Sequence, residues 1–433
     1  MKHILLTTLR ALLKFLAKLT LARYKPAIIG ITGSVGKTST KEAVKAIVAH
    51  ERTVRATLKN FNNELGLPLT ILGDWTSTGR FFFWIKVVFV SLYRLIVKSS
   101  SYPEVLVLEY GVDRPGDMNY LLNIARPHIS IFTAMGTIPV HVEFFSDPEA
   151  VFREKAKIVS QLSATGFAIL NADDESVSKA KNDTRAHVLT FGFSEESNIR
   201  AISFSNHLDD DFQGVILKLV HGGSVVPIYI SHVLGRTQGY AMAAAAAVGL
   251  VFGMNLVSIA EALGTYAPPN GRMRVIQGIK GSILIDDTYN SSPTAVKEAI
   301  ESLKDIKAKH KIAVLGDMLE IGKYTLEAHE KVGKQVAKVV DILVTVGIRG
   351  KFIAESALKA GMNKKQVHMF MSIREASEFL QKKVVKDDVV LLKGSQSVRM
   401  ERVTASLMED PQNAEHFLVR QSPYWLARKG LYE

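Results

Sequence analysis

The peptide GITGSVGKTS occupies residues 30–39, and the fold of the surrounding chain follows from what lies on either side of it. Residues 27–32 form an apolar run typical of a buried strand, and residues 37–50 have the apolar spacing of a helix. Glycines between a strand and a helix let backbone N–H groups turn toward phosphate oxygens, and the helix N-terminus adds its positive end. The unit predicts a nucleotide-binding α/β domain.

This loop is a variant of the phosphate-binding loop, because Ile31 stands where the strict spacing has glycine. We expect Lys37 to neutralise the β- and γ-phosphates and Thr38 to offer its hydroxyl to Mg²⁺. The residues predicted from the loop to contact ATP are Gly33, Ser34, Gly36, Lys37, Thr38 and Ser39.

Strand-like apolar runs alternate with helical patterns along most of the chain, as at residues 105–111 and 128–136. The alternation restarts after residue 271, with strand candidates at 282–290, 311–318, 341–347 and 387–395. The pattern predicts an α/β protein with a central P-loop ATPase domain, whose sheet is mostly parallel, and a C-terminal Rossmann-like α/β domain. We place the boundaries at 1–26 for a basic amphipathic helix, 27–271 for the central domain and 272–433 for the C-terminal domain.

Composition excludes several classes of protein. The 433 residues are 47% hydrophobic and 22% charged, which are ordinary globular values. The chain contains no cysteine, so disulfides, thiolate zinc sites, iron–sulfur clusters and cysteine nucleophiles are excluded. The net charge of +12 favours anionic partners, which include nucleotides, nucleic acid and anionic membranes. Because no nucleic-acid recognition motif is present, we expect no nucleic-acid partner.

Two stretches combine basic and apolar residues, at 1–26 and 80–98. In the first, Arg10, Lys14 and Lys18 recur every four residues and so form one helical stripe. In the second, the cations that share a face are Lys86, Arg94 and Lys98. Neither stretch has the 18 or so uncharged residues of a spanning helix. Two readings stay open: the helices lie on an anionic bilayer, or they pack on the globular body or on each other.

Several motifs, in order, are similar to those of the Mur ligases, which build the peptide of bacterial peptidoglycan. Besides the loop, these are NFNNELGLP at 60–68, EYG with RPGD at 109–117, HVEFF at 141–145 and LNADD at 170–174. In the second half, DDTYN at 286–290, GDMLEIG at 316–322 and KGS with RMER at 393–402 resemble the MurF branch. That branch adds D-alanyl-D-alanine to UDP-N-acetylmuramoyl-tripeptide. The resemblance runs from about residue 28 to residue 405.

The resemblance implies an ATP- and Mg²⁺-dependent ligase. ATP phosphorylates a substrate carboxylate, an amine attacks the acyl phosphate, and phosphate leaves as the amide forms. Lys37, Glu109, His141 and Lys155 are the implied catalytic residues. Thr38, Glu109, His141 and Lys155 are the implied Mg²⁺ ligands, with Lys155 carrying a carbamate. The stretch from Thr137 to Val140 is longer than the family's before the histidine, and Lys157 replaces the family's glutamate.

The resemblance also assigns further binding residues. ATP would be contacted by Gln238 at the adenine, Arg272 at the phosphates and Asp287 at the ribose, with Tyr289 and Asn290 beside it. Asn62 and Asn63 would line the substrate cleft. The candidates for binding the incoming amino substrate are Lys393, Ser395 and Arg399.

The sequence departs from the family before the loop. Because fewer than 30 residues precede the loop in this sequence, we expect the usual UDP-binding domain to be missing, and 80–98 looks like an insertion. We expect a cytoplasmic enzyme, with peripheral attachment at the inner face of the membrane as an open alternative. Without the UDP-binding domain, the muropeptide substrate would be bound by another part of the chain, supplied by a partner or linked to a lipid. The rival hypotheses are the same chemistry on another carboxylate and amino acid, and a non-catalytic membrane-associated ATP-binding protein.

Overall fold

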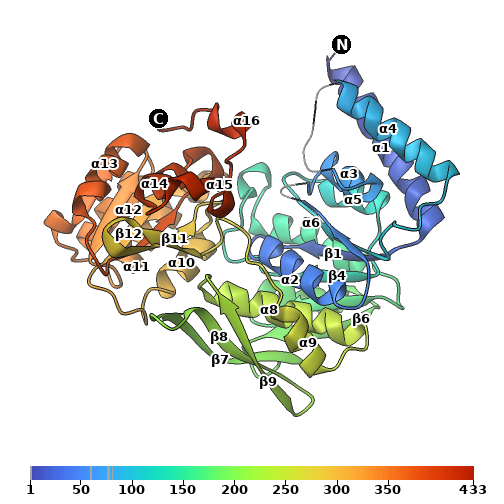
Figure 1. Ribbon diagram of the computed structural model, residues 1–433, viewed down its shortest axis with the longest axis horizontal. Helices are drawn as coiled ribbons and strands as arrows, with labels where there is room; N and C mark the ends of the chain where they lie inside the picture. The colour runs from blue at the N-terminus through green and yellow to red at the C-terminus, as the bar shows by residue number, and fades with distance from the viewer. Residues whose placement is uncertain (1, 59–60, 76–78, 80) are drawn as a thin grey trace.

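The computed structural model describes residues 2–58, 61–75, 79 and 81–433. Residues 1, 60 and 80, which begin three of the stretches named above, lie outside the described residues. The strands form two sheets, one from residues 27–231 and the other from residues 274–393, and Figure 1 shows them side by side. The expectation of an α/β fold with a mostly parallel first sheet is confirmed.

The first sheet has nine strands in the order β2-β3-β1-β4-β5-β6-β7-β8-β9. The strands from β2 to β7 run parallel, whereas β8 and β9 are antiparallel additions at one edge. The bounds are β1 Ala27–Thr32, β2 Val54–Ala56, β3 Val105–Glu109, β4 Ile129–Phe132, β5 Phe167–Asn171, β6 His187–Gly192, β7 Ile199–Leu208, β8 Gln213–His221 and β9 Ser224–Ser231.

Helices cover this sheet on both faces (Figure 1). The expected alanine-rich helix is α8, and its residues Ala241 to Val248 are fully buried. The bounds are α2 Lys37–Ala49, α3 Gly66–Leu72, α5 Asp117–Ile124, η1 Val142–Phe144, α6 Pro148–Ser160, α7 Glu175–Lys179, η2 Ala180–Asp183, α8 Arg236–Val251 and α9 Leu256–Leu263. In the register of β1 and β3, Ile31 pairs with Glu109, so the phosphate loop and this carboxylate leave the same edge of the sheet.

The second sheet has six strands in the order β10-β11-β15-β12-β13-β14, with β10 the antiparallel edge. Its strands are β10 Arg274–Gly278, β11 Ser282–Asp287, β12 Lys311–Gly316, β13 Ile342–Val346, β14 Val367–Phe370 and β15 Val389–Lys393. Its helices are η3 Ile279–Gly281, α10 Pro293–Glu301, η4 Gly322–Tyr324, α11 Thr325–Val336, α12 Gly350–Lys359, η5 Lys364–Gln366, α13 Ile373–Lys383, η6 Gln396–Val398 and α14 Glu401–Leu407. The four strands predicted after residue 271 are therefore present.

The chain's C-terminal tail packs on this domain and on the linker between the domains. It contains η7 Pro411–Asn413, α15 Ala414–Phe417 and α16 Pro423–Leu426. The linker residue Asn270 donates its side-chain amide to the His416 carbonyl at 3.0 Å. Arg420 donates to the Glu401 carboxylate at 2.8 Å.

The two basic apolar stretches are helices α1 Lys2–Tyr24 and α4 Phe81–Ile96, which lie side by side at the end of the molecule away from the C-terminal domain (Figure 1). They pack on the body and on each other, as the second reading proposed, with Leu13, Leu16 and Ala17 buried between them and the body. None of the helices in the described ranges combines the length and the apolar character of a membrane span.

The cationic stripe of α1 faces the protein. Arg10 pairs with Glu64 at 2.6 Å, and Lys14 lies 4.6 Å from the centre of the Tyr120 ring. Lys18 donates to the Asn123 side chain at 2.9 Å. The face of α1 that remains exposed is therefore largely apolar, contrary to a simple amphipathic arrangement with its cations outward.

Candidate active site

The phosphate loop has the conformation that its glycines predict. Gly33 and Gly36 have φ of 140° and 88°, in a region that residues with a side chain rarely adopt. A Cβ at Gly33 would lie 2.1 Å from the Thr133 hydroxyl, so the loop can pass here only without a side chain. The Lys37 ammonium donates to the Gly33 carbonyl at 2.7 Å, which folds the lysine back over the loop. Burial lowers the pKa of Lys37, and the Glu109 carboxylate opposes this shift.

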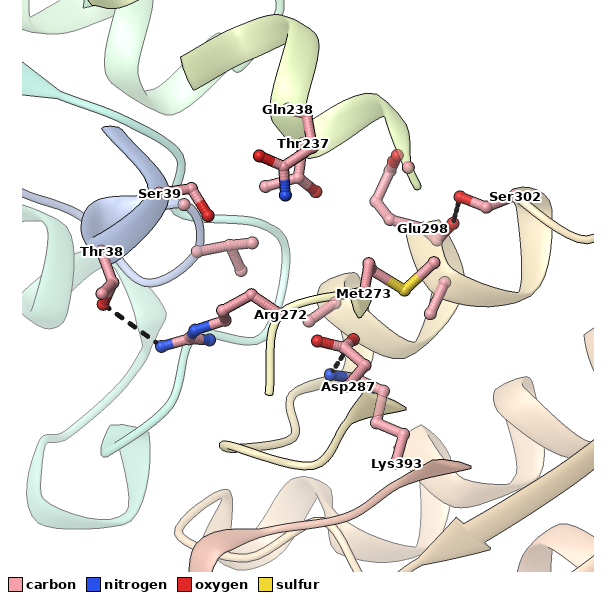
Figure 2. Close-up of a pocket in the computed structure, with 15 residues that line it drawn as sticks. Thr38, Ser39, Thr237, Gln238, Arg272, Met273, Asp287, Glu298, Ser302 and Lys393 are labelled. Carbon is pink, nitrogen blue, oxygen red and sulfur yellow. Dashed lines mark hydrogen bonds and ion pairs between the residues drawn. The ribbon is translucent and has the colours of Figure 1, made fainter. Parts of the chain in front are cut away.

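Four predicted residues meet at the mouth of the loop. The Thr38 hydroxyl donates to Glu109 Oε2 at 3.5 Å, and the Asn62 amide donates to Glu109 Oε1 at 3.4 Å. Arg272 reaches from the interdomain linker and donates to the Thr38 hydroxyl at 3.4 Å (Figure 2). The hydroxyl and carboxylate oxygens form the hard donor set that Mg²⁺ takes, so Thr38 and Glu109 fit this ion.

Lys155 and His141 lie against the loop that follows β3. Lys155 is 1% exposed on α6, and its ammonium donates to the Val112 carbonyl at 3.5 Å. Burial and the nearby charge of Lys37 lower the pKa of Lys155 to about 7. His141 stands between two carboxylates, with Asp113 3.2 Å from Nε2 and Glu320 3.1 Å from Nδ1.

The Glu320 contact connects the two domains. In the part of the chain that the structure describes, no three His, Asp or Glu side chains form a ready metal cluster. Of the four predicted metal ligands, Thr38 and Glu109 hydrogen-bond to each other, whereas Lys155 and His141 contact the loop after β3.

The cleft between the domains contains most of the residues predicted to bind ATP. Figure 2 shows Thr38 and Ser39 facing Thr237 and Gln238 of α8 on one side, and Arg272, Asp287 and Lys393 on the other. Gln238 is 1% exposed, and its amide oxygen accepts the Tyr266 hydroxyl at 2.8 Å. The cleft encloses about 40 Å³, far below the 300–1,000 Å³ of typical ligand pockets.

The structure gives internal partners to the residues predicted to bind the amino substrate. Lys393 is 1% exposed and donates to Asp287 at 2.6 Å and to the Asn290 carbonyl at 2.9 Å. Ser395 accepts the backbone N–H of Leu319 at 2.9 Å. Lys393 thus lines the cleft beside Asp287.

Arg399 is tied to the C-terminal tail instead of the cleft. It is 2% exposed, bonds to Glu401 at 2.5 Å, and donates to the carbonyls of Trp425 and Arg428 at 3.0 and 2.8 Å. Tyr289 lies under the Arg272 guanidinium, 4.1 Å from ring centre to carbon, and so helps to orient that arginine.

A second cavity, of about 480 Å³, contains residues that sequence reasoning missed. It is lined by Arg10, Asn62, Asn63, Glu64, Gly111, Asp113, Gly116, Asp117, Tyr120 and Leu121. Asn62 and Asn63 were predicted to line the substrate cleft. Asp113 and Asp117 lie within a quoted motif and could have been found there, whereas Arg10 lines the cavity only because α1 docks beside α5.

Two family models match most of the chain. The Mur ligase middle domain matches residues 31–81 and 90–249, and the gap between these segments lies within α4. The glutamate ligase domain of Mur ligases matches residues 271–396.

Curated relatives have the same name in different bacteria. The UDP-N-acetylmuramoyl-tripeptide–D-alanyl-D-alanine ligase of Bacillus subtilis is 28% identical over 401 residues, covering 92% of this chain and 79% of the relative. The Haemophilus influenzae protein of that name is 27% identical, covering 91% of this chain and 79% of the relative.

Solved structures agree with these relatives. MurF ligase from Thermotoga maritima in complex with ADP has a TM-score of 0.75 at 27% identity, covering 94% of this chain and 84% of that one. MurF from Acinetobacter baumannii has a TM-score of 0.74 at 25% identity, covering 91% and 80%. The folylpolyglutamate synthase of Mycobacterium tuberculosis, at 16% identity and a TM-score of 0.66, shares the fold alone.

Proposed function

The chain belongs to the Mur ligase family of ATP-dependent ligases, and we propose that it joins D-alanyl-D-alanine to a muramoyl-tripeptide in peptidoglycan precursor synthesis. The observation that carries the proposal is the meeting of Thr38, Glu109 and Arg272. These residues come from the phosphate loop, the end of β3 and the interdomain linker. This arrangement can bind a triphosphate between two domains with its terminal phosphate beside a carboxylate.

In the proposed mechanism, this chain's residues position ATP and neutralise charge. Lys37 and Arg272 hold phosphate oxygens, and Thr38 with Glu109 would hold Mg²⁺. When bound, Mg²⁺ neutralises charge that develops on the transferring phosphoryl group. Asn62 holds one oxygen of Glu109 and keeps that carboxylate directed toward the loop.

The proposed reaction has two steps. A carboxylate oxygen of the tripeptide attacks the γ-phosphorus, and the bond to ADP breaks, which gives an acyl phosphate and ADP. The neutral amine of D-alanyl-D-alanine then attacks the acyl carbon, phosphate leaves with the bonding electrons, and the proton that the amine loses passes to the released phosphate as the amide forms. Closure of the two domains would exclude water from the acyl phosphate. Lys155, as a carbamate, would add a negative charge beside the metal.

The test is phosphate release with mass detection of the product, from ATP, Mg²⁺, UDP-muramoyl-tripeptide and D-alanyl-D-alanine. We expect a product carrying the added dipeptide and one phosphate per product. The Lys37→Ala variant is the control and should lose both signals. ATP hydrolysis without the dipeptide product would overturn the substrate assignment while leaving a ligase for another carboxylate and amine, and no turnover would favour an ATP-binding protein.

We further propose that the enzyme contacts an anionic membrane through the outer apolar face of α1 and α4. This face consists of exposed residues on the two adjacent helices: Leu12, Phe15, Leu19, Ile85, Phe89, Leu92, Tyr93 and Ile96. Phe89 is 69% exposed and Ile96, about two turns further along α4, is 79% exposed, and extended exposed apolar patches mark interaction surfaces. Residues 1–25 and 81–98 contain no Asp or Glu, and Arg23 and Lys86 are exposed on the same two helices, as is Lys98 just after α4.

Flotation with vesicles of phosphatidylglycerol and phosphatidylcholine, and with phosphatidylcholine alone, tests the contact. We expect flotation with the anionic vesicles and its loss in the Phe89→Glu variant. Tyr229 is 59% exposed on β9, so Tyr229→Glu is the matched control and should still float. Equal flotation of both variants, or none of the wild type, would overturn the membrane proposal.

A further inference from the structure

The second cavity is a groove whose outer wall is the N-terminal helix. Arg10 of α1 faces Asn62, Asn63 and Glu64, which precede α3, and the loop from Gly111 into α5 forms the other side. Helix α1 is held in this position by Leu13 and Leu16, which are buried, and by the contact of Lys14 with Tyr120. The groove has a volume of about 480 Å³, which is in the range of pockets that bind small molecules.

The groove and the ATP cleft meet at Glu109. Thr38 lines the ATP cleft and donates to one oxygen of the Glu109 carboxylate. Asn62 lines the groove and donates to the other oxygen. Asp113, also in the groove wall, contacts His141. A carboxylate that enters along the groove would therefore approach the γ-phosphate from the side opposite the nucleotide.

Arg10 differs from the other charged side chains of the groove. Among the described residues that line the groove, it alone is positively charged, beside Glu64, Asp113 and Asp117. Asp113 is held by His141, and Asp117 Oδ2 accepts the backbone N–H groups of residues 113 and 114. These two carboxylates are already occupied within the protein.

The guanidinium of Arg10 has donors to spare. Its Nη2 pairs with Glu64 at 2.6 Å, but both side chains are more than a third exposed, and such pairs contribute little to stability. Its Nε is buried and has no hydrogen-bond partner within the described structure. A ligand oxyanion can replace Glu64 at the Nη2, because a weak and partly exposed ion pair can be exchanged for a charge-assisted hydrogen bond to the ligand.

We propose that α1 supplies Arg10 to bind an oxyanion of the carboxylate substrate, remote from the carboxylate that reacts. This inference rests on the proposed ligase function and adds that the N-terminal helix forms part of the substrate site. The oxyanion is a carboxylate of the peptide or a phosphate of the group that carries the sugar. Arg10 would thereby hold the substrate along the groove with its reacting carboxylate toward Glu109.

Steady-state kinetics of three variants test the proposal. In Arg10→Ala, we expect the KM for the muramoyl-tripeptide to rise about 10-fold or more, with kcat and the KM for ATP nearly unchanged, because a charge-assisted hydrogen bond is lost. Glu64→Gln breaks the same ion pair but keeps the guanidinium, so its KM should stay equal or fall. Lys18→Ala removes a cation of the same helix outside the groove and is the control.

The comparison separates a binding role from a structural one. If Arg10 only fastened α1 to the body through Glu64, Arg10→Ala and Glu64→Gln would raise the KM alike, and that result would overturn the proposal. An unchanged KM in Arg10→Ala would also overturn it. Muramoyl-tripeptide with and without UDP distinguishes the two oxyanions, because a penalty confined to the UDP-linked substrate identifies a phosphate.

Failure of the proposed function would give a different pattern. If the wild type turns over and the variants match it, only the role of Arg10 fails. If the wild type does not turn over, calorimetric titration of the same substrate in the presence of a non-hydrolysable ATP analogue decides. If the wild type binds the substrate and Arg10→Ala binds it more weakly, the groove is a binding site but the ligase function fails. If the wild type does not bind the substrate, both proposals are overturned.

Discussion

Neighbouring residues of the same type have different chemistry here because of burial. Lys155 and Lys157 are two residues apart on α6, but Lys155 is 1% exposed and faces the loop after β3, whereas Lys157 forms an ion pair with Glu154 at 2.6 Å. The departure from the family pattern at Lys157 therefore concerns the outer side of the helix. Of the two, Lys155 is the lysine whose amine can be neutral near pH 7, because its pKa is lowered to about 7.

Lys155→Ala should reduce turnover by roughly 100-fold or more, because a charged group beside the phosphoryl transfer is removed. If that group is a carbamate, short carboxylic acids such as formate should restore part of the activity. The measurement is product formation with and without added acid, and Lys157→Ala is the control that should retain activity. Loss without rescue would contradict the carbamate and leave Lys155 another role.

Asp286 provides a test of pH dependence outside the site. It is fully buried on β11, and burial raises its pKa to about 7, against about 4 in an unfolded chain. Between about pH 4 and pH 7 the unfolded chain loses this proton, whereas the folded state keeps it. The free energy of unfolding therefore falls as the pH rises through this range.

Asp286→Asn keeps the neutral form, and Thr288 and Thr404 can still donate to its oxygen. The variant should gain stability relative to the wild type as the pH rises from 4 to 8, by up to about 4 kcal/mol at 1.36 kcal/mol per pKa unit. Urea unfolding at several pH values measures this, with the exposed Asp210→Asn as control. A difference that does not change with pH would contradict the raised pKa.

At the scale of elements, the glycine loop between β1 and α2 has a geometry that its sequence predicts. Its glycines take backbone angles that residues with a side chain rarely adopt. Gly222, in the β8–β9 turn, also has a positive φ, but a Cβ there would meet open space. Gly33 has both a positive φ and a close neighbour, whereas Gly222 has the positive φ alone. Comparing the two positions separates the effect of backbone conformation from that of steric contact.

Gly33→Ala should weaken ATP binding at least 10-fold and destabilise the fold by about 1–3 kcal/mol, because its Cβ would collide with Thr133. Gly222→Ala should cost about 1 kcal/mol from the conformation alone and leave ATP binding unchanged. Thermal unfolding and nucleotide titration of both variants measure these effects. Equal ATP affinity in Gly33→Ala and the wild type would contradict the assignment of the loop.

Helices α1 and α4 show where an element's pattern is insufficient. The periodicity predicts helices with cations on one side, and both helices are present. The side of α1 that faces solvent depends on residues elsewhere in the chain. The cations of α1 contact Glu64, Tyr120 and Asn123 of the protein body.

At the scale of the whole molecule, the cleft between the domains is too small for ATP as it stands, at about 40 Å³. Gly271 in the linker has φ of 70°, and contacts such as His141 with Glu320 connect the domains near the reaction centre. We therefore expect the domains to separate for ATP to enter and to close again around the nucleotide.

A disulfide across the cleft should block ATP entry. A Cβ at Gly322 would lie 2.9 Å from that of Glu143, so a shift of about 1 Å brings the pair Glu143→Cys and Gly322→Cys into bridging range. The chain has no other cysteine, so this is the one disulfide that can form within it. The oxidised variant should lose nucleotide binding in a titration and regain it on reduction. Binding by the oxidised protein equal to that of its reduced form would contradict the required opening.

The sequence alone determined the alternation of strands and helices, the position of the phosphate loop and the residues at the ends of β1, β3 and β11. These features are local, since spacing, glycine conformation and strand-end position are set by neighbours in the chain. The antiparallel strands β8 and β9 and the edge strand β10 were not predicted, because their pairing joins them to a sheet defined elsewhere.

Only the tertiary structure decided what the charged side chains contact. Lys393 meets Asp287 across 106 residues of sequence, and Arg399 meets the tail that follows it, and the motifs predicted neither contact. Arg10 enters the groove because α1 docks on the body through buried leucines far from the motifs. Charge partners depend on which surfaces the fold brings together, and that information is distributed over the whole chain.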